Sequence, residues 1–107
     1  MNFIEDSKWK ICVKNVPIYA IDLVIFFNDR KLLMGKRINN PAKGYFFVPG
    51  GRIFKNESRK EAFKRITKQE IGSEYDINKS KFLGIYEHFY SNSKWNETSI
   101  STHYIVE

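Results

Sequence analysis

The stretch from Phe47 to Gly72 constrains the fold of this chain more than any other part. An aromatic run leads into Pro49-Gly50-Gly51, where we expect the chain to turn. A helix is predicted from Ser58 to Gly72, because Ser58 followed three residues later by Glu61 is the capping-box pattern that begins helices. Gly72 suits the residue at which a helix ends.

Glu57 is expected just before this helix, which carries Glu61, Arg65 and Glu70. Glu57, Glu61 and Arg65 are spaced by four and should share a helix face, with Glu70 about one turn further along. Glycines let the backbone approach a ligand closely, carboxylates bind hard cations and arginines clamp phosphate oxygens. This combination suits a site that holds a divalent cation against a phosphate.

The remaining sequence predicts one short helix and several strands. A helix is expected over residues 7–16, and the apolar run Ile18–Phe27 reads as a strand buried on both faces. Further strands are expected over residues 31–37, which would form a hairpin with the first, and over 45–48, 82–90 and 98–106. Ala62, Phe63, Ile66 and Ile71 would form an apolar stripe that packs the long helix on the sheet.

Composition narrows the class of protein. A chain of 107 residues with 42% hydrophobic content fits one domain, residues 1–107. The net charge of +6 is spread over scattered lysines, so we expect a solubilising surface and no nucleic-acid partner. Cys12 is the single cysteine, which indicates a reducing compartment. The longest apolar run is too short to span a bilayer and contains Asp22, so a cytoplasmic protein without a membrane contact is expected.

Asp22 stands out as a carboxylate inside that apolar run. Charged side chains are rarely buried without a partner, so Asp22 is either paired for structural reasons or placed in a functional site.

The central stretch resembles the Nudix box, whose pattern is G-x5-E-x7-R-E-U-x-E-E-x-G-U, with U a bulky aliphatic residue. The matching positions are Gly51, Glu57, Arg65, Glu70 and Gly72. Ile66 and Gln69 stand where the box has glutamates, and Thr67 and Ser73 stand at aliphatic positions. This depleted box resembles the branch of GDP-mannose mannosyl hydrolases, as do the segment 37–52, the residues around His88 and the later Thr102-His103-Tyr104.

The resemblance covers the chain from about Ile18 onward and implies an α+β fold, a Nudix-type α/β/α sandwich with a mixed sheet. In that family another strand and a second large helix follow the point where this chain stops. We therefore expect a C-terminally truncated domain, or one whose sheet is completed by a partner subunit.

The resemblance also implies roles for individual residues. One Mg²⁺ would be bound by Glu70 and the backbone carbonyl of Gly50. The positions implied for the substrate are Arg37 and Arg52 at the diphosphate, Asp22 at the sugar, and His88 and Tyr104 as further contacts. Gly51, Glu57, Arg65 and Gly72 would be structural, with Arg65 paired to Glu57 or Glu61. Each functional role has a simpler alternative: an exposed helix glutamate, surface arginines, or a structural strand histidine.

The function implied is Mg²⁺-dependent hydrolysis of GDP-mannose or a related GDP-hexose by a homodimer. Water would attack the anomeric carbon and release GDP and mannose with inversion, because a charge-clamped GDP is a good leaving group. No residue can be assigned to the general base, since in that branch it follows the last strand present here. Alternatives are a non-catalytic GDP-sugar binder and a Nudix pyrophosphohydrolase that attacks phosphorus. A nucleic-acid-binding module fits least well.

Overall fold

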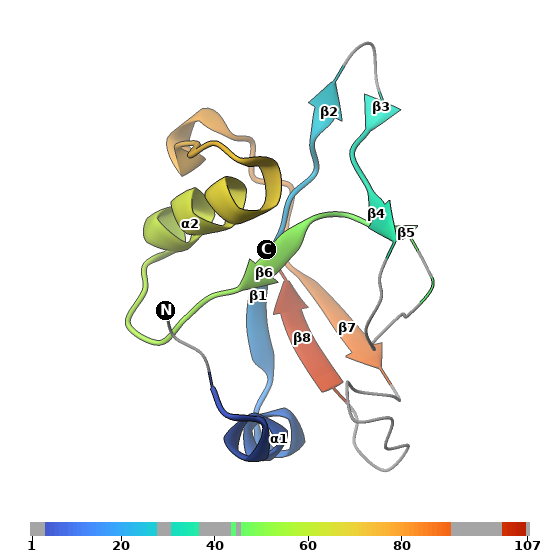
Figure 1. The fold of residues 1–107 in the computed structure, drawn as a ribbon, viewed down its shortest axis with the longest axis vertical. Coiled ribbons are helices and arrows are strands. Elements are labelled where there is room, and N and C mark those ends of the chain that lie inside the picture. The colour runs from blue at the N-terminus through green and yellow to red at the C-terminus, as the bar shows by residue number, and fades with distance from the viewer. Residues whose placement is uncertain (1–3, 28–30, 37–43, 45, 91–101, 107) are drawn as a thin grey trace.

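The computed structural model describes residues 4–27, 31–36, 44, 46–90 and 102–106, with Tyr90 and the last range as backbone only. Two α-helices, one short 3₁₀ helix and eight strands make up this part of the chain (Figure 1). Their order is α1 (Asp6–Asn15), β1 (Ile18–Asp22), β2 (Phe26–Phe27), β3 (Lys31–Leu32), β4 (Gly35–Lys36), β5 (Phe46–Phe47), β6 (Gly50–Arg52), α2 (Arg59–Ile71), η1 (Ile77–Lys79), β7 (Tyr86–Tyr90) and β8 (Thr102–Val106).

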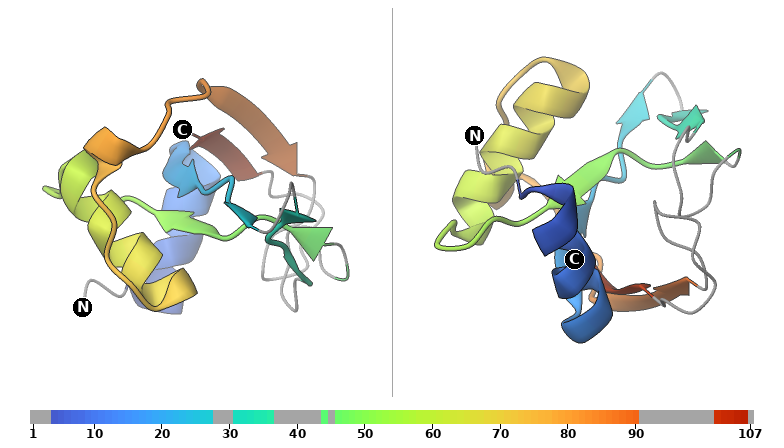
Figure 2. Two further views of the ribbon diagram at one scale, coloured as in Figure 1. Left: turned by 90° about the horizontal axis from the view of Figure 1, so that it is seen from above. Right: turned by 60° about the horizontal axis from the view of Figure 1, so that its bottom comes forward.

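The main sheet is mixed and has the strand order β6-β1-β8-β7. β1 runs parallel to β8 and antiparallel to β6, and β7 is antiparallel to β8. Two small antiparallel pairs, β2–β3 and β4–β5, extend away from it (Figures 1 and 2). The expected α+β fold with a mixed sheet is confirmed.

Helix α2 packs on the sheet through the predicted apolar stripe. Ala62 and Ile66 are buried and form a core cluster with Ile21 and Leu23, and Phe63 packs against that cluster. On the other face of β1, Ile18 and Ala20 are also buried, so this strand is covered on both sides. α1 contacts the sheet at β8.

The ends of α2 follow the local signals in the sequence. The Ser58 side chain accepts a hydrogen bond from the Glu61 N–H, and the Glu61 carboxylate accepts one from the Ser58 N–H. Gly72 ends the helix in the left-handed conformation, with φ of 83°. Both features were predicted.

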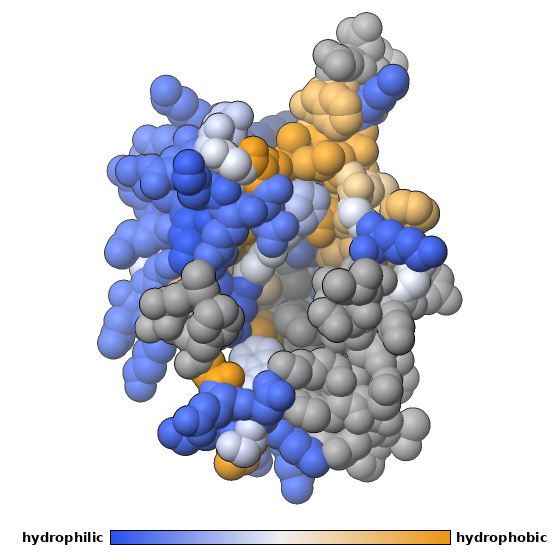
Figure 3. Space-filling view, viewed as in Figure 1, coloured by the Kyte–Doolittle hydropathy of each residue, from blue (hydrophilic) through white to orange (hydrophobic). Residues whose placement is uncertain are grey.

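One predicted strand and one predicted turn are wrong. The run Ile18–Phe27 is not one buried strand, because β1 ends at Asp22 and the chain continues into the separate β2–β3 hairpin. There Phe26 is 64% exposed and Phe27 is 46% exposed, within the apolar arm seen in Figure 3. The predicted glycine turn is instead strand β6, in which Gly50 and Gly51 pair with Asp22 and Ile21.

The other strands are shorter than predicted. β7 begins at Tyr86 rather than residue 82, and β5 covers only Phe46–Phe47. Residues 98–101 of the last predicted strand lie outside the described part of the chain. Among the described residues, no helix has the length and apolar character needed to cross a membrane.

Candidate functional site

The register of the main sheet brings several predicted site residues to one face. Asp22 pairs with Gly50, and Ala20 pairs with Arg52. Side chains two residues apart on a strand share a face, and directly paired residues do so across strands. Asp22 and Arg52 therefore lie on one face of the sheet, while Ile21 and Gly51 face α2.

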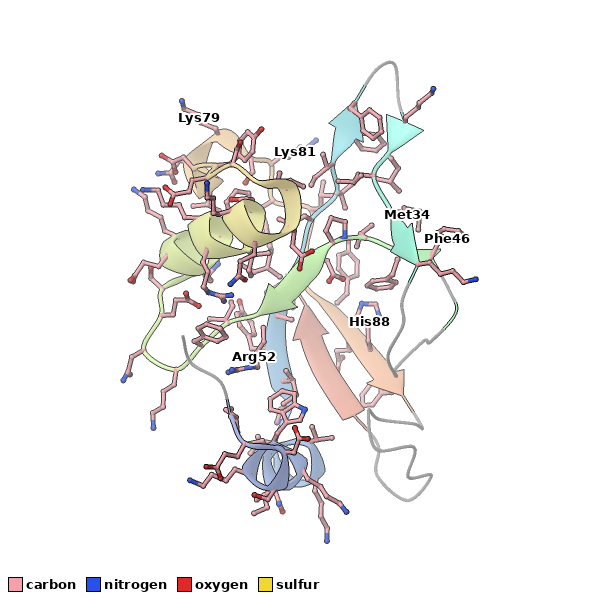
Figure 4. All side chains as sticks on the ribbon, viewed as in Figure 1. Met34, Phe46, Arg52, Lys79, Lys81 and His88 are labelled. Carbon is pink, nitrogen blue, oxygen red and sulfur yellow. The ribbon has the colours of Figure 1, made fainter. Side chains whose placement is uncertain are left out.

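His88 belongs to the same face. Tyr104 is the Cα partner of both Ile18 and His88, so these positions share a face with Asp22. In Figure 4, Arg52 lies beside β6 and His88 beside β7, at the two edges of the sheet. The His88 ring makes an edge-to-face contact with Phe47 of β5, with ring centroids 6.4 Å apart. Arg37 and the side chain of Tyr104 fall outside the described residues.

Gly50 is required by the close approach of β1. A Cβ atom at this position would overlap the backbone carbonyl oxygen of Ile21 and would lie 2.9 Å from Oδ1 of Asp22. The Asp22 carboxylate is therefore next to the Gly50 backbone, whose carbonyl was predicted to bind metal. At Gly51 the neighbour is the helix instead of β1. A Cβ atom there would make a tight contact of 3.3 Å with Cγ1 of Ile66.

Arg65 joins the loop after β6 to helix α2. Its Nε donates to Oε2 of Glu57 over 2.8 Å, and its Nη2 donates to Oε1 over 2.9 Å. Nη2 also donates to the carbonyl oxygen of Arg52, and Nη1 donates to Oε1 of Gln69. Of the two predicted partners of Arg65, the structure thus shows Glu57.

Glu57 is a loop residue, since α2 begins only at Arg59, so the prediction that it shares a helix face with Glu61 and Arg65 is wrong. The loop folds back so that the carboxylate meets Arg65 and also accepts the Phe54 N–H. The hydrogen bond from Arg65 holds the pKa of Glu57 below its ordinary value, and the Phe54 N–H lowers it further.

The remaining motif positions leave one carboxylate for a cation. Glu61 is engaged in the capping box, and Gln69 is bonded to Arg65. Glu70 is exposed and has no hydrogen bond or ion pair within the part of the chain that the structure describes. Within that part, no three His, Cys, Asp or Glu side chains cluster to form a metal site.

The packing of α2 on β6 indicates where Glu70 lies. Ile66, in the middle of α2, faces Gly51, and the helix runs in the direction opposite to β6 (Figures 1 and 2). Its last turn, with Glu70, therefore points toward the Gly50 end of β6. Mg²⁺ is bound in proteins by one or two carboxylates, with water and phosphate oxygens completing its octahedron. An exposed carboxylate and a backbone carbonyl at one end of the sheet fit such an ion.

Trp9 and Phe54 are site residues that the sequence reasoning missed. The Arg52 guanidinium lies over both rings, with Cζ 5.4 Å from the Trp9 centroid and 4.6 Å from the Phe54 centroid. The Arg65 guanidinium also lies over the Phe54 ring, with its Cζ 3.7 Å from the ring centroid. Burial, followed by the positive charge of Arg65, lowers the pKa of Arg52 from its ordinary value. No local signal in the sequence links Trp9 to Arg52, because only packing of α1 brings them together.

Residues 17–107 match the NUDIX domain family. The chain belongs to the Nudix family. A solved structure described as a MutT/nudix family protein from Enterococcus faecalis superposes on 98% of this chain with a TM-score of 0.59 and 18% sequence identity. That likeness concerns the fold, which agrees with the family assignment.

Two curated proteins are similar in sequence. Over 103 residues, the chain is 42% identical to the low-salt glycan biosynthesis protein Agl8 of Haloferax volcanii, covering 96% of this chain and 64% of Agl8. Over 71 residues, it is 44% identical to an ADP-ribose pyrophosphatase of Methanocaldococcus jannaschii, covering 65% of this chain and 40% of that protein. The chain thus spans less than two thirds of the length of either relative.

Proposed function

We propose that this Nudix domain hydrolyses GDP-mannose or a related GDP-hexose with one Mg²⁺, by attack of water at the anomeric carbon. The observation that carries the proposal is that the box retains a single available carboxylate. Glu57 and Glu61 are engaged in other contacts, position 66 is isoleucine, and Gln69 is bonded to Arg65. A site of this kind suits charge neutralisation on a leaving diphosphate better than activation of water at phosphorus.

The roles proposed for the chain's own residues follow from their charge. Glu70 and the Gly50 carbonyl would hold Mg²⁺, which when bound supplies positive charge at the diphosphate oxygens. Arg52 and Arg37 would donate hydrogen bonds to the same oxygens and stabilise the departing GDP. Asp22 would favour the positive charge that develops on the sugar ring, and His88 and Tyr104 would contact the substrate.

The bond changes in the proposed reaction are simple. The water oxygen bonds to the anomeric carbon, the bond from that carbon to the phosphate oxygen breaks, and GDP leaves with the electron pair. The water gives its proton to a general base, and none of the described residues is assigned to that role. The homodimer and the cytoplasmic location stay predictions from the resemblance and from the single cysteine.

The similarity to Agl8, named for glycan biosynthesis, supports a sugar nucleotide as substrate. The similarity to an ADP-ribose pyrophosphatase favours a second candidate, a pyrophosphohydrolase that attacks phosphorus. Both candidates take a sugar joined to a nucleoside diphosphate, and they differ in which bond breaks.

Product analysis separates the candidates. The chain would be incubated with Mg²⁺ and either GDP-mannose or ADP-ribose, and the products would be separated by anion-exchange chromatography. GDP and mannose are the expected products of GDP-mannose. GMP and mannose 1-phosphate, or turnover of ADP-ribose alone, would contradict the proposal. Calorimetric binding of GDP-mannose without turnover would indicate the non-catalytic binder.

A further inference from the structure

The Arg52 guanidinium is held by two aromatic rings from different parts of the chain. Trp9 comes from α1 and Phe54 from the loop after β6, and Arg52 Cζ lies 5.4 Å and 4.6 Å from their respective centroids. Figure 4 places Arg52 between β6 and α1. Both rings are half-buried, so the cation is partly shielded from water, where cation–π attraction is stronger than at an exposed site.

The backbone of Arg52 is fixed as well. Its carbonyl oxygen accepts a 2.7 Å hydrogen bond from Arg65, which is itself held by both carboxylate oxygens of Glu57. The Arg65 guanidinium also lies over the Phe54 ring, so two like charges share one aromatic ring. Repulsion from Arg65 would drive a flexible Arg52 side chain away. The Trp9 ring offsets this repulsion from the side of α1.

We propose that Trp9 and Phe54 are positioning residues that hold the Arg52 guanidinium for the diphosphate of the substrate, which makes α1 part of the ligand site. This inference rests on the proposed function, in which Arg52 contacts the diphosphate. Two rings limit the guanidinium to a narrow set of orientations, so less conformational entropy is lost when a phosphate binds.

The test measures the affinity of the chain for GDP in the presence of Mg²⁺ by isothermal titration calorimetry. Trp9→Leu removes the aromatic face but keeps an apolar side chain, and Trp9→Phe restores an aromatic face. Ile11→Ala serves as the control, because Ile11 is on the same helix and is 61% exposed. We expect Trp9→Leu to weaken GDP binding about three- to fivefold, whereas Trp9→Phe and Ile11→Ala stay within about twofold of wild type.

A double-mutant cycle distinguishes positioning from general support by α1. In an Arg52→Gln background, Trp9→Leu should cause no further loss of GDP affinity, because the group that it positions is gone. An equal loss in both backgrounds, or an unchanged affinity of Trp9→Leu alone, would overturn the positioning role while leaving the proposed function intact. A wild-type chain that binds neither GDP nor GDP-mannose would overturn the proposed function, and the positioning role with it.

Discussion

Every guanidinium nitrogen of Arg65 donates a hydrogen bond, and each acceptor belongs to a different part of the site. Glu57 lies in the loop, Arg52 in β6 and Gln69 one turn along α2. One side chain thus fixes the loop, the strand and the helix relative to one another. Gln69, which replaces a glutamate of the Nudix box, serves this network as a neutral acceptor.

Replacing Glu57 by Gln should make the stability of the protein less dependent on acid pH. The folded-state pKa of Glu57 is depressed below 4.5, so its stabilising contribution is complete above that pH and is lost as the pH falls further. Glu57→Gln should lower the free energy of unfolding by about 2–3 kcal/mol at pH 7. Urea denaturation at pH 7 and pH 3 should show this difference shrinking at the lower pH. An equal difference at both values would contradict the ion pair as its source.

Glu70→Gln should remove the proposed cation ligand without changing the fold. Glu70 is exposed and makes no hydrogen bond or ion pair within the described residues, so the unfolding free energy should stay within about 0.5 kcal/mol of wild type. The affinity for Mg²⁺ with GDP should fall about tenfold or more, measured by calorimetry. Glu74→Gln is the matched control, since Glu74 is an exposed glutamate just beyond the helix. Equal effects of both substitutions would rule out Glu70 as a ligand.

At the scale of elements, the pairing of β6 with β1 determines the shape of the site. The two strands approach so closely at Gly50 that a side chain would overlap the Ile21 carbonyl oxygen. This close approach, together with the antiparallel register, brings the Asp22 carboxylate next to the Gly50 backbone.

Gly50→Ala should therefore separate β6 from β1 and destabilise the protein by about 1–3 kcal/mol. Gly35→Ala is the control, because no atom of the described residues lies within 4 Å of a Cβ at that position in β4. Thermal unfolding followed by circular dichroism should show a clear decrease in Tm for the first variant only. Similar Tm values for the two variants would mean that the close approach at Gly50 does not limit the fold.

The capping box of α2 makes a separate prediction. Ser58→Ala removes the acceptor for the Glu61 N–H and should cost about 1 kcal/mol. Ser73→Ala, beyond the C-terminal end of the same helix, should have little effect on the free energy of unfolding measured with urea. A cost as large for Ser73→Ala would show that the cap is not the source of the stabilisation.

These elements also show what the sequence could predict. Ser58, Glu61 and Gly72 act through contacts within a few residues, so the helix could be read from its own sequence. The end of β1 could not be predicted, because an apolar run does not indicate where strand pairing stops. Phe26 and Phe27, in the same run, belong to a separate exposed hairpin. Gly50 and Gly51 locally favour a turn. They form a strand because they pair with β1, which is distant in the sequence.

The candidate site was predictable to the extent that its residues belong to a recognisable pattern. Glu57 and Arg65 are paired as the Nudix resemblance implied, with Glu57 in the loop just before the helix. Trp9 falls within the helix predicted over residues 7–16, but nothing in its sequence neighbourhood indicates a contact with Arg52. Contacts between distant elements need the three-dimensional structure.

At the scale of the whole molecule, the domain sets a mixed sheet against α2 on one face and gathers Asp22, Arg52 and His88 on the other. Glu70 lies in the last turn of α2, which points toward the Gly50 end of β6. A substrate that spans this arrangement would have its diphosphate near Glu70 and Arg52. The central claim is that such a substrate is cleaved at carbon rather than at phosphorus.

The most direct measurement is turnover of GDP-mannose with Mg²⁺ in ¹⁸O-labelled water, followed by mass spectrometry of the nucleotide product. The GDP is decisive, because the reducing end of free mannose exchanges its oxygen with water without an enzyme. We expect GDP that carries no label, since the new bond forms at the anomeric carbon. The ¹⁸O label in GDP, or in GMP with release of mannose 1-phosphate, would show attack at phosphorus and would contradict the proposed function.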